Sequence, residues 1–154
     1  MPHPPMFADD DPYLGRLRPL ALAFPDAVEA VAHGRPTFRV QKMFAVYGGG
    51  TKGDRATRRD YPHGLLLVPD PEERAALAAD PRVFVPAYYG PYGWLGLDLA
   101  TAPPGEVDWQ EVAELLDSSY RQVATARQVA LLDAGHGPAG APRPGGDLPA
   151  GPRR

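Results

Sequence analysis

The chain contains no cysteine. Disulfide bonds, thiolate metal sites and a thiol nucleophile are therefore excluded, and a sequence without cysteine is typical of a reducing compartment. Long apolar runs are absent as well. No stretch approaches the ~20 apolar residues of a membrane-spanning helix, and the N-terminus lacks the apolar run and the positive charge of a signal peptide. We therefore expect a cytoplasmic protein with no membrane segment.

Residues that could carry covalent or metal chemistry are scarce. The only two serines, Ser118 and Ser119, fall in the middle of an expected helix and not on an exposed nucleophile elbow. The four histidines have neither the i, i+4 spacing nor the short spacing of a metal site. No catalytic residue, cofactor or bound metal ion is predicted, and we expect a protein that is not an enzyme.

One glycine motif has to be weighed against this expectation. Residues 48–53 formally satisfy the pattern G-x-G-x-x-G. A dinucleotide-binding turn of this kind must open an apolar helix within a β-α-β unit. The following residues, 54–60, are polar and offer no apolar face, and the chain has no Gly-Lys-Ser/Thr sequence for a Walker motif. The glycines therefore favour a flexible hairpin end over a nucleotide site.

The two ends of the chain differ in composition from its middle. Residues 1–8 are rich in proline, and residues 134–154 consist mostly of Gly, Pro, Ala and Arg. Such segments lack the apolar side chains that offset the entropy cost of ordering a chain. We predict disordered tails at 1–8 and 134–154, and a single α+β domain over residues 9–133, which is a common size for one core.

Capping signals predict the helices at the two ends of this domain. Asp11 is an N-cap residue before Pro12, and the helix that follows should be kinked or split by Pro19. Asp108 begins a long helix with an apolar stripe at three-four spacing, which should reach about Leu132.

A short helix and several strands are predicted between them. The helix begins at Asp70 and Pro71 and ends near Ala79. Strands are predicted at 37–40, 43–47, 65–68, 83–85 and 94–99. Residues 28–33 are either a short strand, which we favour, or a helix remnant. The glycines 48–50 should end the third strand and leave residues 51–63 as an exposed basic loop. Strands that are not alternated with helices indicate an α+β design and not β-α-β units.

Positive charge is concentrated in one part of a mildly acidic chain. The net charge is −3, but residues 35–63 hold seven basic and two acidic residues, a balance of +5. The remainder holds nine basic and 17 acidic residues, a balance of −8. Such a chain can present a single cationic face, although a solvated loop surface would have the same composition. The seven cations are Arg35, Arg39, Lys42, Lys52, Arg55, Arg58 and Arg59.

Aromatic residues cluster beside proline and glycine between residues 86 and 94. Tyr88, Tyr89, Tyr92 and Trp94 could stack on a nucleic-acid base or another planar group. The alternative is that these rings close one end of the sheet, and we favour this interpretation for Trp94.

Seven short motifs in a fixed order between Leu14 and Leu132 carry a resemblance to a known family. They are HGRPTFRV at 33–40, KMFA at 42–45, LLV at 66–68, DPEER at 70–74, PAYYG at 86–90, GWLGLD at 93–98 and VDW at 107–109. Together with Ser119 and Tyr120 in the helix that follows, they resemble the MmcQ/YjbR family.

The resemblance implies a two-layer α+β fold. In it, a curved antiparallel sheet is packed by an N-terminal helix, a small middle helix and a long C-terminal helix. It also implies the family's description as DNA-binding proteins with a double-wing arrangement, and it brings no catalytic residues with it. The basic loop that begins with TKGDR at 51–55 looks longer than is typical for the family.

Two hypotheses for function follow. In the first, the seven cations contact DNA phosphates, and Tyr88 or Tyr89 stacks on a base. The acidic total and the lack of a recognition helix rich in Arg, Asn or Gln count against sequence-specific binding. In the second, the chain is a small-molecule or protein-binding module whose site lies around Tyr88, Tyr89 and Trp94.

Overall fold

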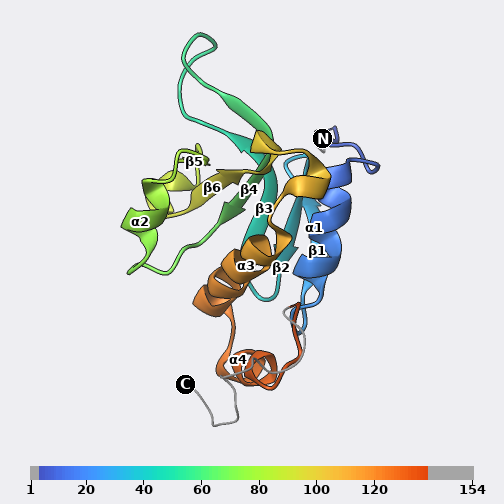
Figure 1. Cartoon of the computed structure of the whole chain (residues 1–154). Coiled ribbons are helices and arrows are strands. Elements are labelled where there is room, and N and C mark those ends of the chain that lie inside the picture. Colours follow the sequence, from blue (N-terminus) through green and yellow to red (C-terminus); the bar gives the residue numbers. More distant parts are fainter. Residues whose placement is uncertain (1–3, 139–154) are drawn as a thin grey trace.

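The computed structural model describes residues 4–138 of the chain. Its centre is a six-stranded antiparallel sheet in the order β1-β2-β3-β4-β6-β5, with α1 and α3 packed against it (Figure 1). The strands are β1 Val28–Ala32, β2 Arg35–Arg39, β3 Met43–Gly50, β4 Asp60–Leu67, β5 Val83–Phe84 and β6 Leu95–Asp98. The helices are α1 Pro12–Leu22, α2 Arg74–Ala78, α3 Trp109–Val123 and α4 Ala126–Asp133, with 3-10 turns η1 Gly90–Tyr92, η2 Leu99–Thr101 and η3 Pro104–Glu106. The α+β class and the antiparallel sheet are confirmed.

The first helix begins as its sequence predicts. The carboxylate of Asp11 accepts hydrogen bonds from the backbone N–H groups of Tyr13 and Leu14, and Pro12 occupies the first turn. The predicted split at Pro19 is wrong, because α1 continues through this residue as one helix. Pro19 lies on the exposed side, while apolar residues of the other side are buried in the core and hold the helix together.

The prediction of one long C-terminal helix is wrong, because the structure has two helices in this region. α3 ends at Val123, and Thr125 then caps α4 in a capping box with Gln128. The two residues exchange hydrogen bonds, Gln128 Oε1 accepting from Thr125 N at 2.9 Å and Thr125 Oγ1 from Gln128 N at 3.2 Å. The apolar spacing runs across the break, so periodicity alone does not reveal it.

The short middle helix starts later than predicted. Asp70 accepts a hydrogen bond from the backbone N–H of Glu72 and forms a turn, and helical structure begins only at Arg74. No residue of α2 is buried.

The third strand is longer than predicted. β3 continues through the glycines to Gly50, where it pairs with Asp60 of β4. Gly48 has a φ of +88°, a left-handed conformation that glycine adopts without strain, and the register shifts beside it. This bulge lets the strand continue instead of ending it. The exposed basic loop therefore covers residues 51–59, and the predicted loop boundary at residue 63 is wrong.

The main core lies between the sheet and the helices α1 and α3. Its largest fully buried side chains include Tyr47 of β3 and Tyr120 of α3, with Phe24, Phe38 and Phe44 around them. Tyr120 stacks on Phe24 with ring centroids 4.8 Å apart and meets Phe44 edge to face at 5.3 Å. This core fixes the sheet against one helical layer.

The other face of the sheet has a smaller apolar cluster. It consists of Val46, Leu66, Phe84 and Trp94, with Met43, Tyr61, Val68 and Tyr89 around its edge. The ring of Phe84 lies over Gly64 and Gly96, and Tyr61 stacks on that ring with centroids 3.9 Å apart. The segment 85–93 reaches this cluster through Tyr89, so a loop and not a helix packs here.

The predicted tails lie only partly within the described residues. Residues 1–3 and 139–154 lie outside them. In the N-terminal segment, Met6 donates its backbone N–H to the carbonyl of Gly34 at 2.8 Å, and Phe7 packs against the core. The prediction of a disordered tail is therefore not met at Met6 and Phe7.

Candidate nucleic-acid interface

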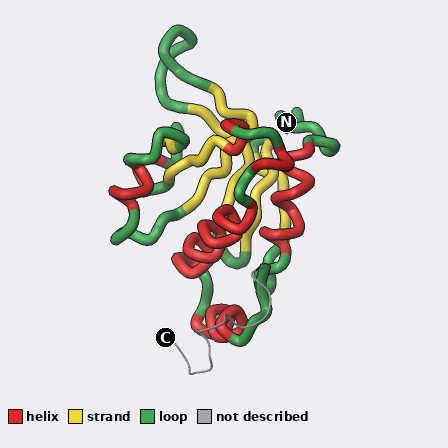
Figure 2. Tube along the Cα trace, in the orientation of Figure 1, coloured by secondary structure: helices red, strands yellow, loops and turns green. Residues whose placement is uncertain are grey.

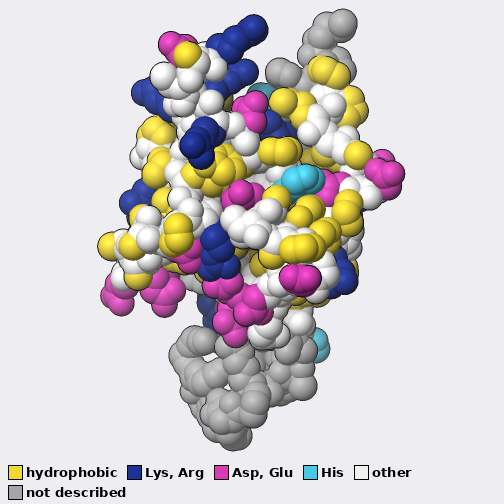
Figure 3. Space-filling model, turned by 45° about the horizontal axis from the view of Figure 1, so that its top comes forward, with side chains coloured by type: hydrophobic (Ala, Val, Ile, Leu, Met, Phe, Trp, Pro, Cys, Tyr) yellow, Lys and Arg dark blue, Asp and Glu magenta, His cyan; other side chains and the backbone are white. Residues whose placement is uncertain are grey.

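Four of the seven predicted cations lie on one projecting loop. Figure 2 shows the segment between β3 and β4 extending beyond the rest of the molecule. Lys52, Arg55, Arg58 and Arg59 are all exposed on it. In the space-filling view, Lys and Arg side chains gather around this projection (Figure 3). We call residues 51–59 the basic loop.

Internal hydrogen bonds give the basic loop a defined backbone. Asp54 accepts from the backbone N–H groups of Ala56 at 2.9 Å and Thr57 at 3.1 Å, and these bonds lower the pKa of its carboxyl. Thr51 accepts from the backbone N–H of Arg59 at 2.8 Å. The main acidic group of the loop is thus engaged by its own backbone, while the basic side chains extend into solvent.

Arg35 lies at the root of this hairpin. It begins β2, and its guanidinium lies so close to Gly48 of β3 that a Cβ on this glycine would be 2.3 Å from Nη1. Burial lowers the pKa of Arg35, an effect partly offset by the charges of Asp60 and Tyr89. Within residues 4–138 no carboxylate lies within 4.0 Å of it. A half-buried cation without an ionic partner is suited to an anionic ligand.

Two of the predicted cations do not join the basic loop. Arg39 lies four residues along β2 from Arg35, about 13 Å away at the usual strand rise, and donates from Nη2 to Thr37. Its Nε atom is buried and has no hydrogen-bond partner within the described part of the chain. Lys42 precedes the eight-residue strand β3, whereas the basic loop follows it, which separates them by about 25 Å.

The cations of the basic loop differ from the other arginines in their pairing. Arg18 binds Glu29, and Arg121 bridges Asp117 and Asp133. Of the seven predicted cations, only Arg58 has a carboxylate within 4.0 Å in the described residues, namely Asp60 at that limit. The positive charge of the basic loop is therefore available to an external anion.

The aromatic segment 85–93 meets the root of the hairpin. Ala87 donates its backbone N–H to the carbonyl of Gly50, the last residue of β3, at 2.8 Å. Tyr88 follows and is 88% exposed, whereas Tyr89 turns inward against Trp94 with ring centroids 5.1 Å apart. Trp94 is only 9% exposed and belongs to the apolar cluster, so its ring offers no free stacking face. Of the three predicted stacking residues, Tyr88 presents its ring to solvent.

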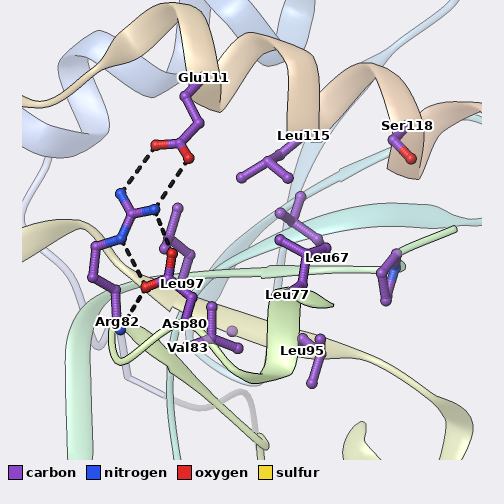
Figure 4. Close-up of a pocket in the computed structure, with 12 residues that line it drawn as sticks. Leu67, Leu77, Asp80, Arg82, Val83, Leu95, Leu97, Glu111, Leu115 and Ser118 are labelled. Carbon is purple, nitrogen blue, oxygen red and sulfur yellow. Dashed lines mark hydrogen bonds and ion pairs between the residues drawn. The ribbon is translucent and has the colours of Figure 1, made fainter. Parts of the chain in front are cut away.

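A pocket elsewhere in the molecule has its charges satisfied internally. It lies between α2, β5, β6 and α3 and is lined mainly by apolar side chains, five of them leucines, with Arg82 at one end (Figure 4). Asp80 and Glu111 both hold the Arg82 guanidinium, at 2.7 and 3.0 Å. The arginine therefore joins this edge of the sheet to α3 and is not free to bind a ligand.

One polar cluster was not predicted from the sequence. Tyr47 of β3 donates its phenol proton to Asp11 at 2.6 Å, and Nδ1 of His63 on β4 lies 2.7 Å from the phenol oxygen and 3.1 Å from the carboxylate. Both neighbours present lone pairs to Nδ1, so this nitrogen carries the ring proton. The ring of Tyr13 packs against the imidazole at 4.6 Å. The cluster ties the root of the β3–β4 hairpin to the start of α1.

Between residues 4 and 138, no group of three or more His, Asp or Glu side chains is placed to hold a metal ion. None of the helices in the described part of the chain is both long and apolar enough to cross a bilayer.

Comparison with models of protein families gives a match over about two thirds of the chain. The model of the YjbR family matches residues 22–122, which include all six strands and most of α3. No curated protein matches the chain.

Proposed function

The chain belongs to the YjbR family, and from this premise we propose that it binds DNA through phosphate contacts of the basic loop and of Arg35, without acting as an enzyme. The observation that carries the proposal is the loop itself. Four exposed cations occupy residues 51–59, with a single carboxylate at the 4.0 Å limit among the described residues. The double-wing arrangement expected from the resemblance stays a prediction, in which the β3–β4 hairpin would supply one wing.

The chemistry of the loop favours binding without sequence readout. Lysine and arginine side chains that neutralise phosphates release condensed counterions, so the affinity falls with salt in proportion to the number of contacts. Phosphate contacts position a protein on DNA and carry no sequence information of their own. The long helices α1 and α3 pack on the sheet and do not accompany the loop (Figure 1). We therefore expect affinity that depends strongly on salt and weakly on sequence.

The test is a salt series of DNA binding with the full chain. The triple variant Arg55/Arg58/Arg59→Ala should reduce the slope of log K against log [salt] by about 2 to 3, because each lost phosphate contact removes about 0.7 to 0.9 from it. The matched control is Arg16/Lys42/Arg127→Ala, which removes the same charge from α1, the β2–β3 turn and α4. The control should keep most of the slope.

An unchanged slope in the loop variant, or an equal loss in the control, would remove the basic loop from the binding surface. Arg127 pairs with Asp26 at an exposed site, so its replacement should cost little stability.

A second candidate function is supported by the exposed aromatic rings. Tyr88 and Tyr92 are 88% and 82% exposed, which is high for tyrosine and suits a small planar ligand or a protein partner. This function predicts binding that changes little with salt and that survives the loop substitutions. The salt series therefore distinguishes the two functions.

A further inference from the structure

We propose that the nucleic acid bound is single-stranded and that Tyr88 stacks on one of its bases. This inference rests on the proposed function, because it assigns a strand type and a base contact to the same surface. It is carried by the exposure of Tyr88, by its backbone conformation and by its position at the root of the hairpin.

Tyr88 has a conformation that a bulky residue seldom adopts. Its φ is +70°, in the left-handed region, where glycine or asparagine is common and an aromatic residue is unusual. The side chain does not offset this cost by packing, since it is 88% exposed. The exposed ring of Tyr88 therefore does not contribute to the stability of the fold. The ring is therefore explained by a contact outside the chain.

The backbone on both sides of Tyr88 is held in place. Gly90 donates to the carbonyl of Pro86 and Tyr89 to that of Ala87, both at 2.8 Å. The Tyr89 side chain packs on Trp94 in the apolar cluster. The ring of Tyr88 is thus presented on a preorganised loop, which lowers the entropy cost of stacking on a ligand.

The same loop is joined to the cationic hairpin. Ala87 bonds to Gly50 at 2.8 Å, and the basic loop begins at the next residue, Thr51. On the neighbouring strand β2, the half-buried guanidinium of Arg35 lies against Gly48, two residues before Gly50. A ring for a base and cations for phosphates therefore occur side by side.

This pairing of features suits a single strand better than a duplex. Bases within a duplex are stacked on one another, and their faces are closed to a side chain. Single strands expose their bases, and proteins bind them by combining cationic grooves with aromatic stacking. A β-ribbon such as the β3–β4 hairpin can also enter a duplex groove, but the stacked bases of a duplex would leave the exposed ring of Tyr88 without a face to contact. Beside the basic loop the structure provides an aromatic ring.

The experiment compares three labelled probes of equal length with the full chain at fixed low salt. They are oligo-dT, an abasic strand with the same phosphates, and a duplex. We expect oligo-dT to bind more tightly than either of the others. Tyr88→Asn removes the ring and keeps a residue that tolerates positive φ, and it should weaken oligo-dT binding about 5- to 100-fold. It should leave binding of the abasic strand unchanged.

Two variants serve as controls. Tyr88→Trp restores an aromatic face and should bind oligo-dT about as tightly as the original chain. Tyr92→Asn removes the other exposed tyrosine of the segment, which lies in η1 next to Gly93, whose carbonyl accepts a hydrogen bond from Arg74 of α2, and should have little effect.

The outcomes separate the two proposals. Equal affinity for oligo-dT and the abasic strand, tighter binding of the duplex, or no effect of Tyr88→Asn on oligo-dT would overturn the inference while the function stands. An absence of salt-dependent binding to all three probes would overturn the proposed function and the inference with it.

Discussion

At the scale of single residues, the buried phenol of Tyr47 connects the hairpin that carries the basic loop to the start of α1. Its side chain is 1% exposed, and it bonds to the carboxylate that caps α1. Tyr47 and His63 stand on the two strands of the hairpin that carries the basic loop. The cluster with Asp11 therefore fixes the direction in which that hairpin leaves the sheet.

Tyr47 also predicts how stability depends on pH. Burial, together with the hydrogen bond to Asp11, raises its pKa far above the usual value of about 10. A raised pKa contributes stability in full below about pH 10, and this contribution is lost as the pH rises and the unfolded chain ionises first. The free energy of unfolding should therefore fall above about pH 10, by about 1.4 kcal/mol per pH unit for this group. Tyr120, whose pKa burial raises to about 12, adds a similar loss between about pH 10 and 12.

Urea denaturation from pH 8 to 12 measures this dependence. In Tyr47→Phe the decline should be shallower by about 1.4 kcal/mol per pH unit, because no phenol remains to ionise. Tyr92→Phe is the control, since it removes the phenol oxygen of a tyrosine that is 82% exposed. Parallel declines in the original chain and in Tyr47→Phe would show that this phenol is not protected in the native state.

Sequence reasoning could predict the cations but not this cluster. A local excess of positive charge is visible in composition, and it located the basic loop without any structure. Asp11 was predicted as a helix cap, which it is, but its second role depends on residues 36 and 52 positions away. The sequence predicts an exposed loop at His63, because the apolar run of the following strand begins only at Leu65. No local pattern marks such a long-range contact.

At the scale of secondary-structure elements, we expect alanine substitutions at two glycines to have opposite effects on stability. A Cβ on Gly96 of β6 would lie 2.3 Å from the ring of Phe84, so Gly96→Ala should displace that ring and cost about 1–3 kcal/mol. Gly15 is exposed in α1 and has no atom within 4 Å of the same position, so Gly15→Ala should stabilise the chain by about 0.5–1 kcal/mol.

The free energies of unfolding of both variants, measured by urea denaturation, check this pair. Similar values for the two alanine variants would mean that Phe84 does not pack over Gly96 as the structure has it. Phe84→Leu in the background of Gly96→Ala should recover part of the loss, since a smaller side chain leaves room for the added methyl group.

The elements that could be predicted are those with local signals. Asp11 with Pro12 predicts the start of α1, the bend at residues 41–42 separates β2 from β3, and the apolar run 65–68 lies at the end of β4. The errors occur where a tertiary or competing signal decides. The Gly48 bulge prolongs β3 because β4 lies beside it to accept the pairing. The capping box at Thr125 ends the preceding helix although apolar spacing continues through it.

At the scale of the whole molecule, the arginines that carboxylates hold in place differ in role from the cations of the basic loop. Arg82 and Arg121 are each held by two carboxylates and join separate elements of the fold. The cations of the basic loop are exposed, and only one of them has a carboxylate at the 4.0 Å limit within the described chain. Much of the acidic excess is thus used in internal pairs. This arrangement lets a chain of net charge −3 present a cationic projection.

The central claim is that nucleic acid binds at the basic loop and the adjoining aromatic segment. An NMR titration of the full chain with oligo-dT tests it most directly, because every assigned amide reports its own surroundings. We predict the largest shift changes at residues 51–59, at Arg35 and at residues 87–90, with α1 and α3 nearly unchanged. Changes confined to α1, α3 or α4, with residues 51–59 unaffected at saturation, would contradict it.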